Sequence, residues 1–502
     1  MSVVKDDRSE PSSASVTSVE KGQQLQVPLN DAAAALQKYT PEQIRRTWRK
    51  VDSYIMPVSI LLYLASYIDR TNIANAKVLG LFTDLKLSNN EYSLALSIFF
   101  IGYVLFETPS NILLKRFSPR WYIPTMTCIW GTVCACFAAV HNAKGLIVIR
   151  FFLGLAEAGF LPGIVFWLGC WYPRSMQGRR YALLYSSVSL TGAFGGLLAT
   201  AIHSLDGAHG IAGWRWIFIV EGVITTGLGL LAYLVMSSYP ADAHWLSAEE
   251  RDIINLTNES DRALKAREGF SSAQIRSAFT DWRTYAWALM FLGTYIPVYS
   301  VVLSLPTVVS GLGYKGTTAT LMACPPYGVG FFAVLISGWT VDRYGHLFYH
   351  YVAGIGVTII ALIVLMVVEN LVARYVMFFF VMFMFVPISV MWAWLSSNVA
   401  GSNKRAAAQG FIFSTGNIGG AIGAQIYRAE FAPRYVQGHG INIALYALAL
   451  ASGTIVWWSY KRDNALRNAA ASEQDQGLER PDMLGEDLGD LGDRHPRFRY
   501  LT

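Results

Sequence analysis

Long apolar stretches constrain the fold of this chain more than any other feature of its sequence. A helix needs about 20 mostly apolar residues to cross the hydrocarbon core of a bilayer. Six such stretches lie near 52–72, 91–113, 121–140, 145–171, 179–202 and 214–236, and six more lie near 284–310, 318–340, 347–368, 373–397, 408–428 and 441–460. The sequence therefore predicts an all-α integral membrane protein with twelve transmembrane helices.

The composition agrees with a membrane protein and argues against a soluble one. Hydrophobic residues make up 53% of the chain and charged residues only 15%, against roughly 25% charged residues in ordinary globular proteins. The 43 glycines also fit, because small residues let helices pack closely in lipid. We expect most of the 15 tryptophans and 26 tyrosines to face lipid or the membrane interface.

The positions of lysine and arginine predict the orientation of the spans. Basic clusters precede the first stretch, follow the second, fourth, tenth and twelfth, and recur in the central loop. Positive residues favour the cytoplasmic side, so both termini are expected to be cytoplasmic, in a multi-pass protein of the plasma membrane. The predicted parts are a disordered cytoplasmic N-terminal tail (1–50), a six-helix half (51–236), a cytoplasmic central loop (237–283), a second six-helix half (284–460) and a cytoplasmic C-terminal tail (461–502). In the central loop, Ser247 and Glu250 form a capping-box pattern, which predicts a short surface helix.

Patterns typical of enzymes are missing from the sequence. The eight histidines are scattered, and no nucleotide-binding loop or nucleophile elbow occurs. The five cysteines lie in apolar runs without metal-ligand spacing, so we expect them to be packing residues. We therefore expect no enzymatic activity, no metal, no cofactor and no nucleic-acid partner.

Two motifs recur at similar offsets in the two sets of spans. Asn111–Ser118 follows the second stretch and Gly338–Gly345 the eighth, while the glycine-rich runs Thr191–Gly196 and Thr415–Gly420 lie in the fifth and eleventh. The chain therefore reads as two six-helix halves in parallel repeat, which is the organisation of the major facilitator fold, with a substrate site near the midplane between pseudo-symmetric halves. Gly338, Asp342, Arg343 and Gly345 match the cytoplasmic gating-loop signature of that superfamily, whereas Lys115 replaces the expected aspartate in the first half.

Eight further motifs carry a narrower resemblance. They are Tyr67-Ile-Asp69-Arg70-Thr-Asn72-Ile, Glu107-Thr-Pro109-Ser-Asn111, Trp171-Tyr-Pro, Gly213-Trp-Arg-Trp-Ile-Phe, Cys324-Pro-Pro-Tyr327, Asn398-Val-Ala-Gly401-Ser-Asn-Lys404-Arg405, Gly416-Asn417-Ile-Gly-Gly and Phe498-Arg-Tyr500. On these motifs the chain resembles the anion:cation symporter family, and especially its fungal allantoate-permease branch. Met176-Gln177 departs from the family pattern, in which an acidic residue is frequent.

Ionisable residues at membrane depth are costly and are candidates for function. The predicted spans contain Asp69, Arg70, Glu107, Arg150, Glu157 and Glu221. Arg150 and Glu157 are two helical turns apart and share a face, either toward a cavity or in a structural ion pair that locks two helices. Asp69 and Arg70 follow an apolar run of only about 15 residues, so they lie either inside the span or at its solvated outer end. Glu221 is expected to be structural.

The resemblance implies roles for four of these residues. In related symporters of sugar acids, the residues that match Asp69 and Glu157 carry protons. The residue that matches Arg70 binds the substrate carboxylate, and the one that matches Arg150 tunes the glutamate or contacts substrate. The chemistry is suitable, because the planar fork of arginine fits a carboxylate and a buried carboxylic acid can take up a proton at physiological pH.

Aromatic and amide side chains are expected to complete the binding pocket. Tyr67 and Tyr103 match site tyrosines of the sugar-acid symporters, although both could equally be packed aromatic residues. Asn417 and Trp392 are candidates to contact the substrate from the second half. Glu107 is a candidate accessory charge, as a third titrating group or as the partner of a helix-end cation.

These features together predict a secondary transporter that works by alternating access as a monomer. The leading hypothesis is proton-coupled symport of a small organic anion, namely a carboxylate such as a vitamin, an allantoate-like compound or a sugar acid. One alternative is a proton-driven exporter of a metabolite or toxic compound. Another is a nutrient sensor that signals without transporting.

Overall fold

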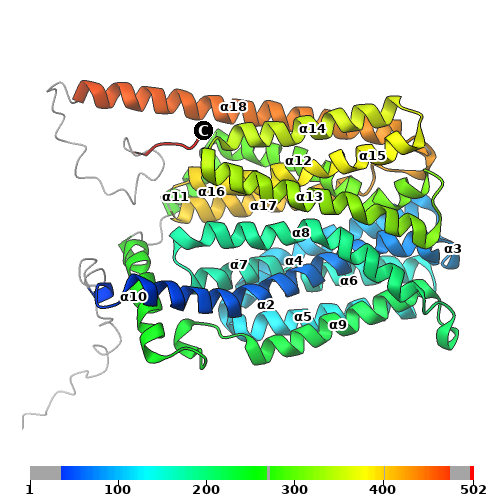
Figure 1. Cartoon of the computed structure of the whole chain (residues 1–502), viewed down its shortest axis with the longest axis horizontal. Coiled ribbons are helices and arrows are strands. Elements are labelled where there is room, and N and C mark those ends of the chain that lie inside the picture. Colours follow the sequence, from blue (N-terminus) through cyan, green and yellow to red (C-terminus); the bar gives the residue numbers. More distant parts are fainter. Residues whose placement is uncertain (1–34, 268–271, 401, 433, 475–497) are drawn as a thin grey trace, which may run out of the picture.

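The computed structural model describes residues 35–267, 272–400, 402–432, 434–474 and 498–502, which excludes most of the predicted N-terminal tail. Every regular element in these residues is a helix, and the long helices run side by side in one bundle (Figure 1). Ten segments of the described residues are long and apolar enough to cross a membrane. The two other predicted spans coincide with α4 (Asn89–Phe117) and α17 (Ser402–Gly423), which lie in the same bundle.

The helices fall into two groups that follow the chain, coloured blue to green and green to orange in Figure 1. The first half comprises α2 (Pro41–Ala76), α4, α5 (Pro119–Ala135), α6 (Ala143–Glu157), α7 (Phe160–Trp171), α8 (Arg174–His203) and α9 (Gly213–Val235), with the short α3 (Phe82–Asp84) after α2. The second half comprises α12 (Trp282–Ser310), α13 (Gly316–Tyr344), α14 (Leu347–Val367), α15 (Leu371–Val381), α16 (Phe385–Asn398), α17 and α18 (Val436–Gln474). Along the chain, α10 (Ala248–Arg267) and α11 (Ser272–Thr280) connect the first half to the second.

Helix caps explain why two helices begin where they do. The Thr40 side chain accepts a hydrogen bond from the backbone N–H of Gln43, and the Gln43 side chain bonds back to Thr40, so α2 starts at Pro41, ahead of the predicted boundary at residue 51. The capping box predicted in the central loop is confirmed. Ser247 N donates to Glu250 Oε2 at 2.8 Å, and Glu250 N donates to Ser247 Oγ at 3.2 Å. These reciprocal bonds satisfy N–H groups that a helix start leaves unpaired.

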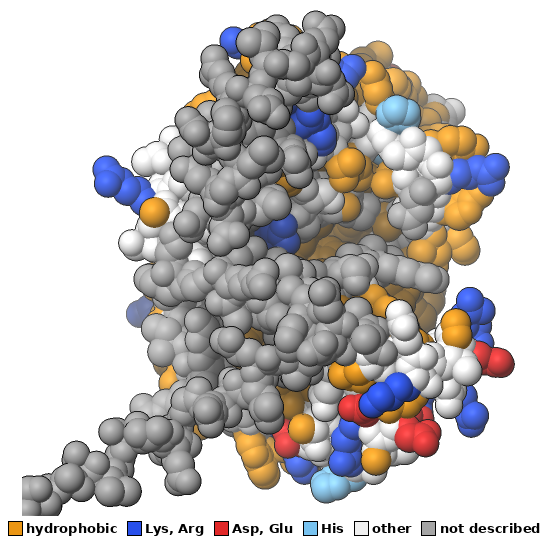
Figure 2. Space-filling view, turned by 90° about the vertical axis from the view of Figure 1, so that its left-hand side faces the viewer, with side chains coloured by type: hydrophobic (Ala, Val, Ile, Leu, Met, Phe, Trp, Pro, Cys, Tyr) orange, Lys and Arg blue, Asp and Glu red, His pale blue; other side chains and the backbone are white. Residues whose placement is uncertain are grey.

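The two ends of the bundle differ, and we name them the α10 end and the α3 end after the helices that lie there (Figure 1). The first described residues and residues 498–502 both lie at the α10 end, as an even number of crossings requires. Figure 2 views this end. Charged side chains gather in its lower part, over α10, whose first turn carries Glu249 and Glu250, whereas hydrophobic side chains are visible between the two halves.

The glycine runs noted in the sequence lie where the halves meet. A β-carbon on Gly196 of α8 would overlap the Cys324 sulfur of α13, and one on Gly420 of α17 would overlap the Phe100 ring of α4. The fifth span therefore packs on the eighth, and the eleventh packs on the second. This is the equivalence that a parallel repeat of six helices predicts, and glycine provides the close approach in both places.

Hydrogen bonds join the halves toward the α3 end. Ser97 Oγ of α4 donates to Ala421 O of α17 at 2.8 Å, and Gln425 Nε2 donates to Ser93 O at 3.0 Å. At the α10 end, the ion pairs between described residues of the spans stay within one half: Arg180 pairs with Asp52, Arg283 with Asp463, and Lys404 with Asp281. The halves are therefore held together at the α3 end, and each half is tied internally at the α10 end.

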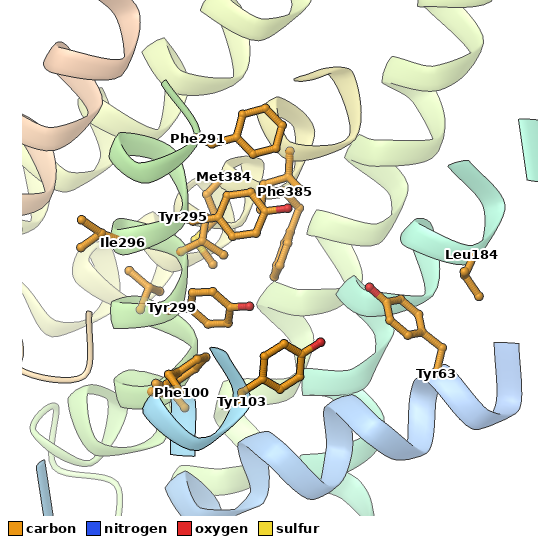
Figure 3. Close-up of a cluster of buried hydrophobic side chains, with 14 of the residues drawn as sticks. Tyr63, Phe100, Tyr103, Leu184, Phe291, Tyr295, Ile296, Tyr299, Met384 and Phe385 are labelled. Atoms are coloured by element: carbon orange, nitrogen blue, oxygen red, sulfur yellow. The ribbon is translucent and has the colours of Figure 1, made fainter. Parts of the chain in front are cut away.

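Buried aromatic side chains fill much of the space between the halves (Figure 3). Tyr63 of α2 and Tyr103 of α4 approach from the first half, and Tyr295 and Tyr299 of α12 approach from the second. The hydroxyl groups of these tyrosines point toward the space that separates them. The middle of the bundle is thus aromatic, with polar tips directed inward.

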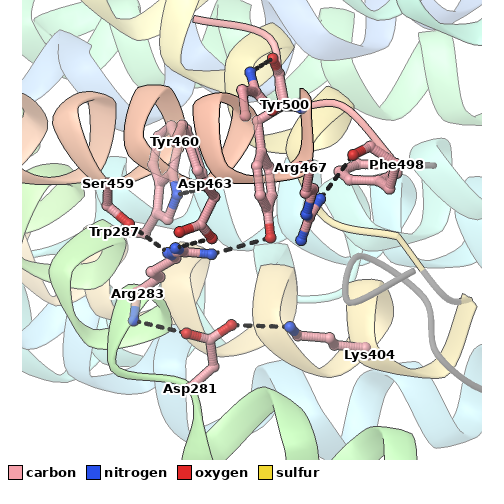
Figure 4. A network of polar contacts seen from close by, with 11 residues as sticks. Asp281, Arg283, Trp287, Lys404, Ser459, Tyr460, Asp463, Arg467, Phe498 and Tyr500 are labelled. Atoms are coloured by element: carbon pink, nitrogen blue, oxygen red, sulfur yellow. Dashed lines mark hydrogen bonds and ion pairs between the residues drawn. The ribbon is translucent and has the colours of Figure 1, made fainter. Parts of the chain in front are cut away.

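Residues 498–501 return to the α10 end and dock on the second half (Figure 4). The Tyr500 ring stacks on Tyr460 at 4.3 Å, and its hydroxyl accepts a bond from Arg283 Nη1 at 3.0 Å. Leu501 N donates to Asn398 Oδ1 at 2.7 Å, while Leu501 O accepts from Asn398 Nδ2 at 3.0 Å and from Trp394 Nε1 at 2.8 Å. The segment therefore occupies a built socket on α12, α16 and α18.

We expect Asn398→Ala to destabilise the protein, because it leaves both backbone groups of Leu501 without their amide partner. The loss of a buried hydrogen-bonding partner costs about 1–3 kcal/mol, and Asn398 is only 1% exposed. Thermal unfolding of the protein in nanodiscs would measure the loss. Asn468→Ala is the matched control, since it removes only an exposed bond from Arg499. Equal melting temperatures for the two variants would contradict a stabilising role of the socket.

Candidate functional site

A cavity lies between the two halves. Its described lining comes from α2 and α8 in the first half and from α12, α13 and α16 in the second, and it consists of aromatic, aliphatic and hydroxyl side chains. They are Tyr67, Thr71, Tyr185, Val188, Ser189, Thr191, Tyr295, Val298, Tyr299, Val302, Tyr327, Val334, Phe385, Ile388 and Ser389. A mostly apolar pocket with a few polar groups, placed between the two halves of a helical bundle, is a typical site for a small molecule.

The structure resolves the alternative that the sequence left open for Asp69 and Arg70. The helix that carries them, α2, continues to Ala76, and the two side chains are only 1% and 6% exposed. They therefore lie inside the first span, and a span end with both groups in solvent is excluded. A buried charge needs a partner, and the two residues have different ones.

Arg70 lies in an aromatic cage next to the cavity. Its guanidinium carbon is 4.9 Å from the ring centroid of Tyr67, 5.1 Å from that of Phe99 and 5.0 Å from that of Tyr103. Tyr67 also lines the cavity, so Arg70 lies directly behind the cavity wall. Aromatic faces attract a cation and exclude water from it, which strengthens its interaction with any anion that reaches it.

Glu157 is the ionic partner of Arg70. Arg70 Nη2 donates to Glu157 Oε1 at 3.0 Å, and the Ser66 hydroxyl donates to the same oxygen. The other carboxylate oxygen, Oε2, has no hydrogen-bond partner among the described residues. Glu157 is the last residue of α6, before a break at which Pro162 enters the first turn of α7, a position where the missing proline N–H costs nothing.

Arg150 interacts with α2 rather than with Glu157. Both of its Nη atoms donate to the backbone oxygen of Arg70 at 3.4 Å. The ion pair that Glu157 forms with a described residue of another helix is the pair with Arg70 of α2. Arg150 thus supports the position of Arg70, and its charge faces the rings of Phe99 and Phe137 at 5.8 and 5.7 Å.

Asp69 does not line the cavity. It accepts hydrogen bonds from Trp130 Nε1 at 3.1 Å and from Thr225 Oγ1 at 2.9 Å, and Cys134 Sγ lies 3.7 Å from its other oxygen. These partners belong to α5 and α9, so Asp69 lies inside the first half. Glu221 lies in the same region, where it accepts a hydrogen bond from Asn72.

Trp392, Asn417 and Glu107, which were predicted as site or accessory residues, bond to cavity tyrosines or link the two halves. Trp392 Nε1 donates to the Tyr295 hydroxyl at 2.8 Å, and the Trp392 ring lies 4.3 Å from Tyr185 of the first half. Asn417 Oδ1 accepts a hydrogen bond from the Tyr299 hydroxyl at 3.4 Å. Glu107 Oε2 accepts one from Ser414 at 3.3 Å, between α4 and α17. Asn417 and Trp392 thus hold two cavity tyrosines.

The predicted gating residues lie near the end of α13, away from the cavity. Arg343 is exposed, and its guanidinium carbon lies 5.6 Å from the Trp339 ring centroid and 5.7 Å from that of Tyr344. The side chain of Asp342 lies outside the described part of the structure. Arg343 takes no part in the cavity lining.

Sequence reasoning missed most of the cavity wall. Tyr185, Tyr295, Tyr299 and Tyr327 line it. Of these, only Tyr327 was noted in the sequence, as part of a family motif and not as a site residue. One signal was available for two of them, because Tyr295 and Tyr299 are four residues apart and therefore share a helix face. The sequence held no signal for the hydrogen-bonding partners of Asp69 and Glu157, because those partners come from other spans that are distant in the chain.

Comparisons with known proteins agree with this arrangement. A family model described as Major Facilitator Superfamily matches residues 59–424. The MFS transporter prlL of a fungal species is 35% identical over 79% of this chain and 82% of its own length. The MFS-type transporter cnsO of Penicillium expansum is 32% identical, over 91% of this chain and 90% of its own. The Major facilitator-type transporter hxnP of Emericella nidulans is 28% identical over 97% of this chain and 99% of its own length.

A solved structure has the same fold. It is a bacterial homolog of the human lysosomal transporter Spinster, in an inward-facing and unoccupied conformation, with a TM-score of 0.63 and 16% identity. The match covers 81% of this chain and 96% of that one. The predicted fold class, a major facilitator fold with two six-helix halves, is confirmed.

Proposed function

This chain belongs to the Major Facilitator Superfamily, and on that premise we propose that it is a proton-coupled symporter of a small organic anion. Membership makes it a multi-pass membrane protein and a secondary transporter of a small molecule, and it confirms the expectation that the chain is not an enzyme. The placement in the anion:cation symporter family, in the allantoate-permease branch, is part of the proposal. The motifs from Tyr67 to Tyr500 support it.

The observation that carries the proposal is the buried pair of Arg70 and Glu157 behind the cavity wall. While Glu157 is charged, it occupies the guanidinium that a carboxylate would bind. A proton on Glu157 removes its negative charge and releases Arg70 to the substrate. Proton and anion then favour the same state of the transporter, and such reciprocal bias is coupling.

The remaining predicted residues have supporting roles in this mechanism. Asp69, which points from α2 into the first half, is the second proton carrier. Arg150 fixes the backbone of Arg70. Tyr67, Tyr103, Trp392 and Asn417 shape the pocket, and Glu107 links the halves. Arg343 and Asp342 belong to the gating loop. The protein acts as a monomer in the plasma membrane, with its termini in the cytoplasm and without a cofactor.

Transport in proteoliposomes tests the proton coupling. A panel of small carboxylates is added to liposomes that contain the protein and an internal pH-sensitive dye. At least one carboxylate is expected to acidify the lumen, and its accumulation is expected to rise about tenfold for each pH unit of inward gradient at one proton per anion. Protein-free liposomes control for diffusion of the neutral acid. Uptake that ignores the gradient would contradict the proposal.

A further inference from the structure

Glu221 of α9 is a buried carboxyl group to which the proposed mechanism gives no role. The residue is 2% exposed, and its Oε1 accepts a hydrogen bond from Asn72 of α2. Its Oε2 has no hydrogen-bond partner among the described residues. An unpaired buried oxygen costs stability, so the structural role that the sequence suggests does not account for this residue.

Two contacts between α2 and α9 place Glu221 close to Asp69. Thr225 Oγ1 of α9 donates to Asp69 Oδ2 at 2.9 Å. Glu221 and its partner Asn72 lie one helical turn farther along the same two helices, which separates the two carboxyl groups by roughly 5 Å along the bundle. Glu221 lies on the side of Asp69 that faces the α3 end, because α2 runs toward that end and α9 runs away from it (Figure 1).

No cation compensates these two carboxyl groups within the described part of the chain. Neither forms an ion pair with a described lysine or arginine. Arg150 bonds to the backbone oxygen of Arg70. The Lys77 ammonium, just after α2, faces the rings of Phe82 and Tyr92 at 5.4 and 4.4 Å. Two uncompensated charges of the same sign repel each other in a dry interior, so one of the two carboxyl groups is expected to hold a proton.

The donors around Asp69 favour its ionised form. Trp130 Nε1 donates to it at 3.1 Å, Thr225 Oγ1 donates at 2.9 Å, and the Cys134 thiol lies 3.7 Å from its Oδ1. Hydrogen bonds to a carboxylate stabilise its charge. Glu221, with a single donor, is therefore the group expected to be neutral.

Two asparagines can serve Glu221 in either form. Asn72 donates to Glu221, and Asn75 Nδ2 donates to Asn72 Oδ1 at 2.8 Å. Each amide carries a donor and an acceptor, so a turn of both amides lets Asn72 Oδ1 accept the proton of a neutral Glu221. The two amides thus suit a residue that gains and loses a proton.

The Thr225 hydroxyl group is placed to connect the two carboxyl groups. It donates to Asp69, whereas the hydroxyl group of the neighbouring Thr226 donates to Gly222 O of its own helix at 2.7 Å. The Thr225 oxygen retains lone pairs that can accept a proton, and Glu221 lies one turn earlier on α9. A proton that leaves Glu221 for this oxygen displaces the hydroxyl proton to Asp69.

We infer that Glu221 is a proton-binding residue, neutral while Asp69 is ionised, and that it passes its proton to Asp69 through Thr225. The step conserves charge, because Glu221 ionises as Asp69 becomes neutral, and a proton from the α3 end then restores Glu221. Neither carboxyl group lines the cavity, so the proton and the substrate take separate routes. The relay rests on the proposed function, whereas the protonation of Glu221 does not.

Infrared spectroscopy of the full chain in nanodiscs tests the protonation of Glu221. A neutral carboxyl group absorbs at a higher frequency than an ionised one, so the wild-type protein at neutral pH is expected to show an acid band that Glu221→Gln loses and Asp69→Asn retains. Glu221→Asp is expected to shift the band, and it replaces the glutamine variant if that variant does not fold. An acid band that Glu221→Gln leaves unchanged would overturn the inference, and so would one that Asp69→Asn removes instead.

Uptake into proteoliposomes tests the relay, with gluconate, nicotinate and allantoate as probes of the three proposed carboxylate classes. Glu221→Gln and Thr225→Val are expected to slow gradient-driven uptake at least about tenfold, because a positioned proton donor accelerates a step by roughly 10²–10⁴-fold. Counterflow exchange, which moves no net protons, is expected to keep the wild-type rate. Thr225→Ser keeps the hydroxyl group and Thr226→Val removes one outside the relay, so both controls are expected to retain uptake. Unchanged uptake in Glu221→Gln, or equal slowing of uptake and counterflow, contradicts the relay.

The protonation of Glu221 and the proposed symport can fail separately. Wild-type uptake that is absent or ignores the pH gradient, together with an acid band assigned to Glu221, overturns symport and the relay but upholds the neutral Glu221. Gradient-driven uptake without such a band upholds symport and overturns the inference.

Discussion

Arg70→Ala is expected to weaken binding of the transported carboxylate severely. The substitution removes the cation behind the cavity wall and leaves Glu157 as a buried carboxylate without its ionic partner. Removing one partner of a buried charge pair between a protein and its ligand costs about 2–5 kcal/mol of binding free energy, so the affinity of the variant for the carboxylate is expected to fall roughly 30-fold or more. Titration of the purified variant with a carboxylate that the wild-type protein binds would measure the loss.

Two further variants separate binding from folding. Arg70→Ala combined with Glu157→Gln removes both charges, so the protein is expected to regain thermal stability while binding stays weak. Arg70→Lys keeps the charge but not the planar fork that fits a carboxylate, and intermediate affinity is expected. Wild-type affinity in the folded double variant would show that Arg70 does not hold the anion.

Glu157→Gln is expected to uncouple transport from protons while leaving substrate exchange intact. Glutamine keeps the shape of the side chain but cannot gain or lose a proton, so Arg70 is no longer released by protonation. One pH unit of gradient supplies about 1.4 kcal/mol, enough for roughly tenfold accumulation with one proton, and the variant should lose this accumulation. Uptake with and without a pH gradient, and counterflow exchange without one, measure the two properties.

Asp69→Asn provides the comparison for Glu157→Gln. Asp69 is bound by Trp130 and Thr225 inside the first half, so its loss is expected to impair accumulation while the affinity of Arg70 for substrate stays close to that of the wild type. Gradient-driven accumulation that persists in Glu157→Gln would contradict its assignment as a proton carrier. If gradient-driven accumulation persists in Asp69→Asn but is lost in Glu157→Gln, Glu157 is sufficient for coupling.

Much of the fold could be predicted from the sequence because its causes are local. Apolar length determines the spans, and the repeated glycine runs mark the places where the halves meet, as Gly196 and Gly420 do. The helix α2 begins before the apolar stretch near 52–72 that the sequence shows, because hydropathy measures burial in lipid, whereas a helix can extend into water when it is capped. Thr40 and Gln43 supply that cap.

The site was harder to predict because its contacts are distant in sequence. Asp69 and Arg70 are adjacent, yet neighbours on a helix point about 100° apart, and the sequence does not say which of them faces the cavity. Their partners, Thr225 and Glu157, come from other spans. The residues that carry charge could therefore be named, but their pairing and the aromatic wall could not.

We expected most tryptophans and tyrosines to face lipid or the interface, but seven of the 15 tryptophans and 14 of the 26 tyrosines are buried inside the bundle. Four of the 15 are exposed, namely Trp121, Trp282, Trp339 and Trp458. Several buried ones use the indole N–H to satisfy distant acceptors: Trp130 donates to Asp69, Trp167 to Ser237 O and Trp394 to Leu501 O. A large apolar ring with one donor suits such places, but amino-acid type alone does not reveal them.

The docked segment 498–501 also has a consequence for biogenesis. A ribosome makes all twelve spans before it makes these residues, so Asn398 and Trp394 enter the membrane without the partner that later satisfies them. The α10 end of the second half therefore matures last. A chain interrupted after α18 would display an empty, aromatic socket next to unpaired amide and indole groups. Such a surface distinguishes chains that lack the docked segment from chains that carry it.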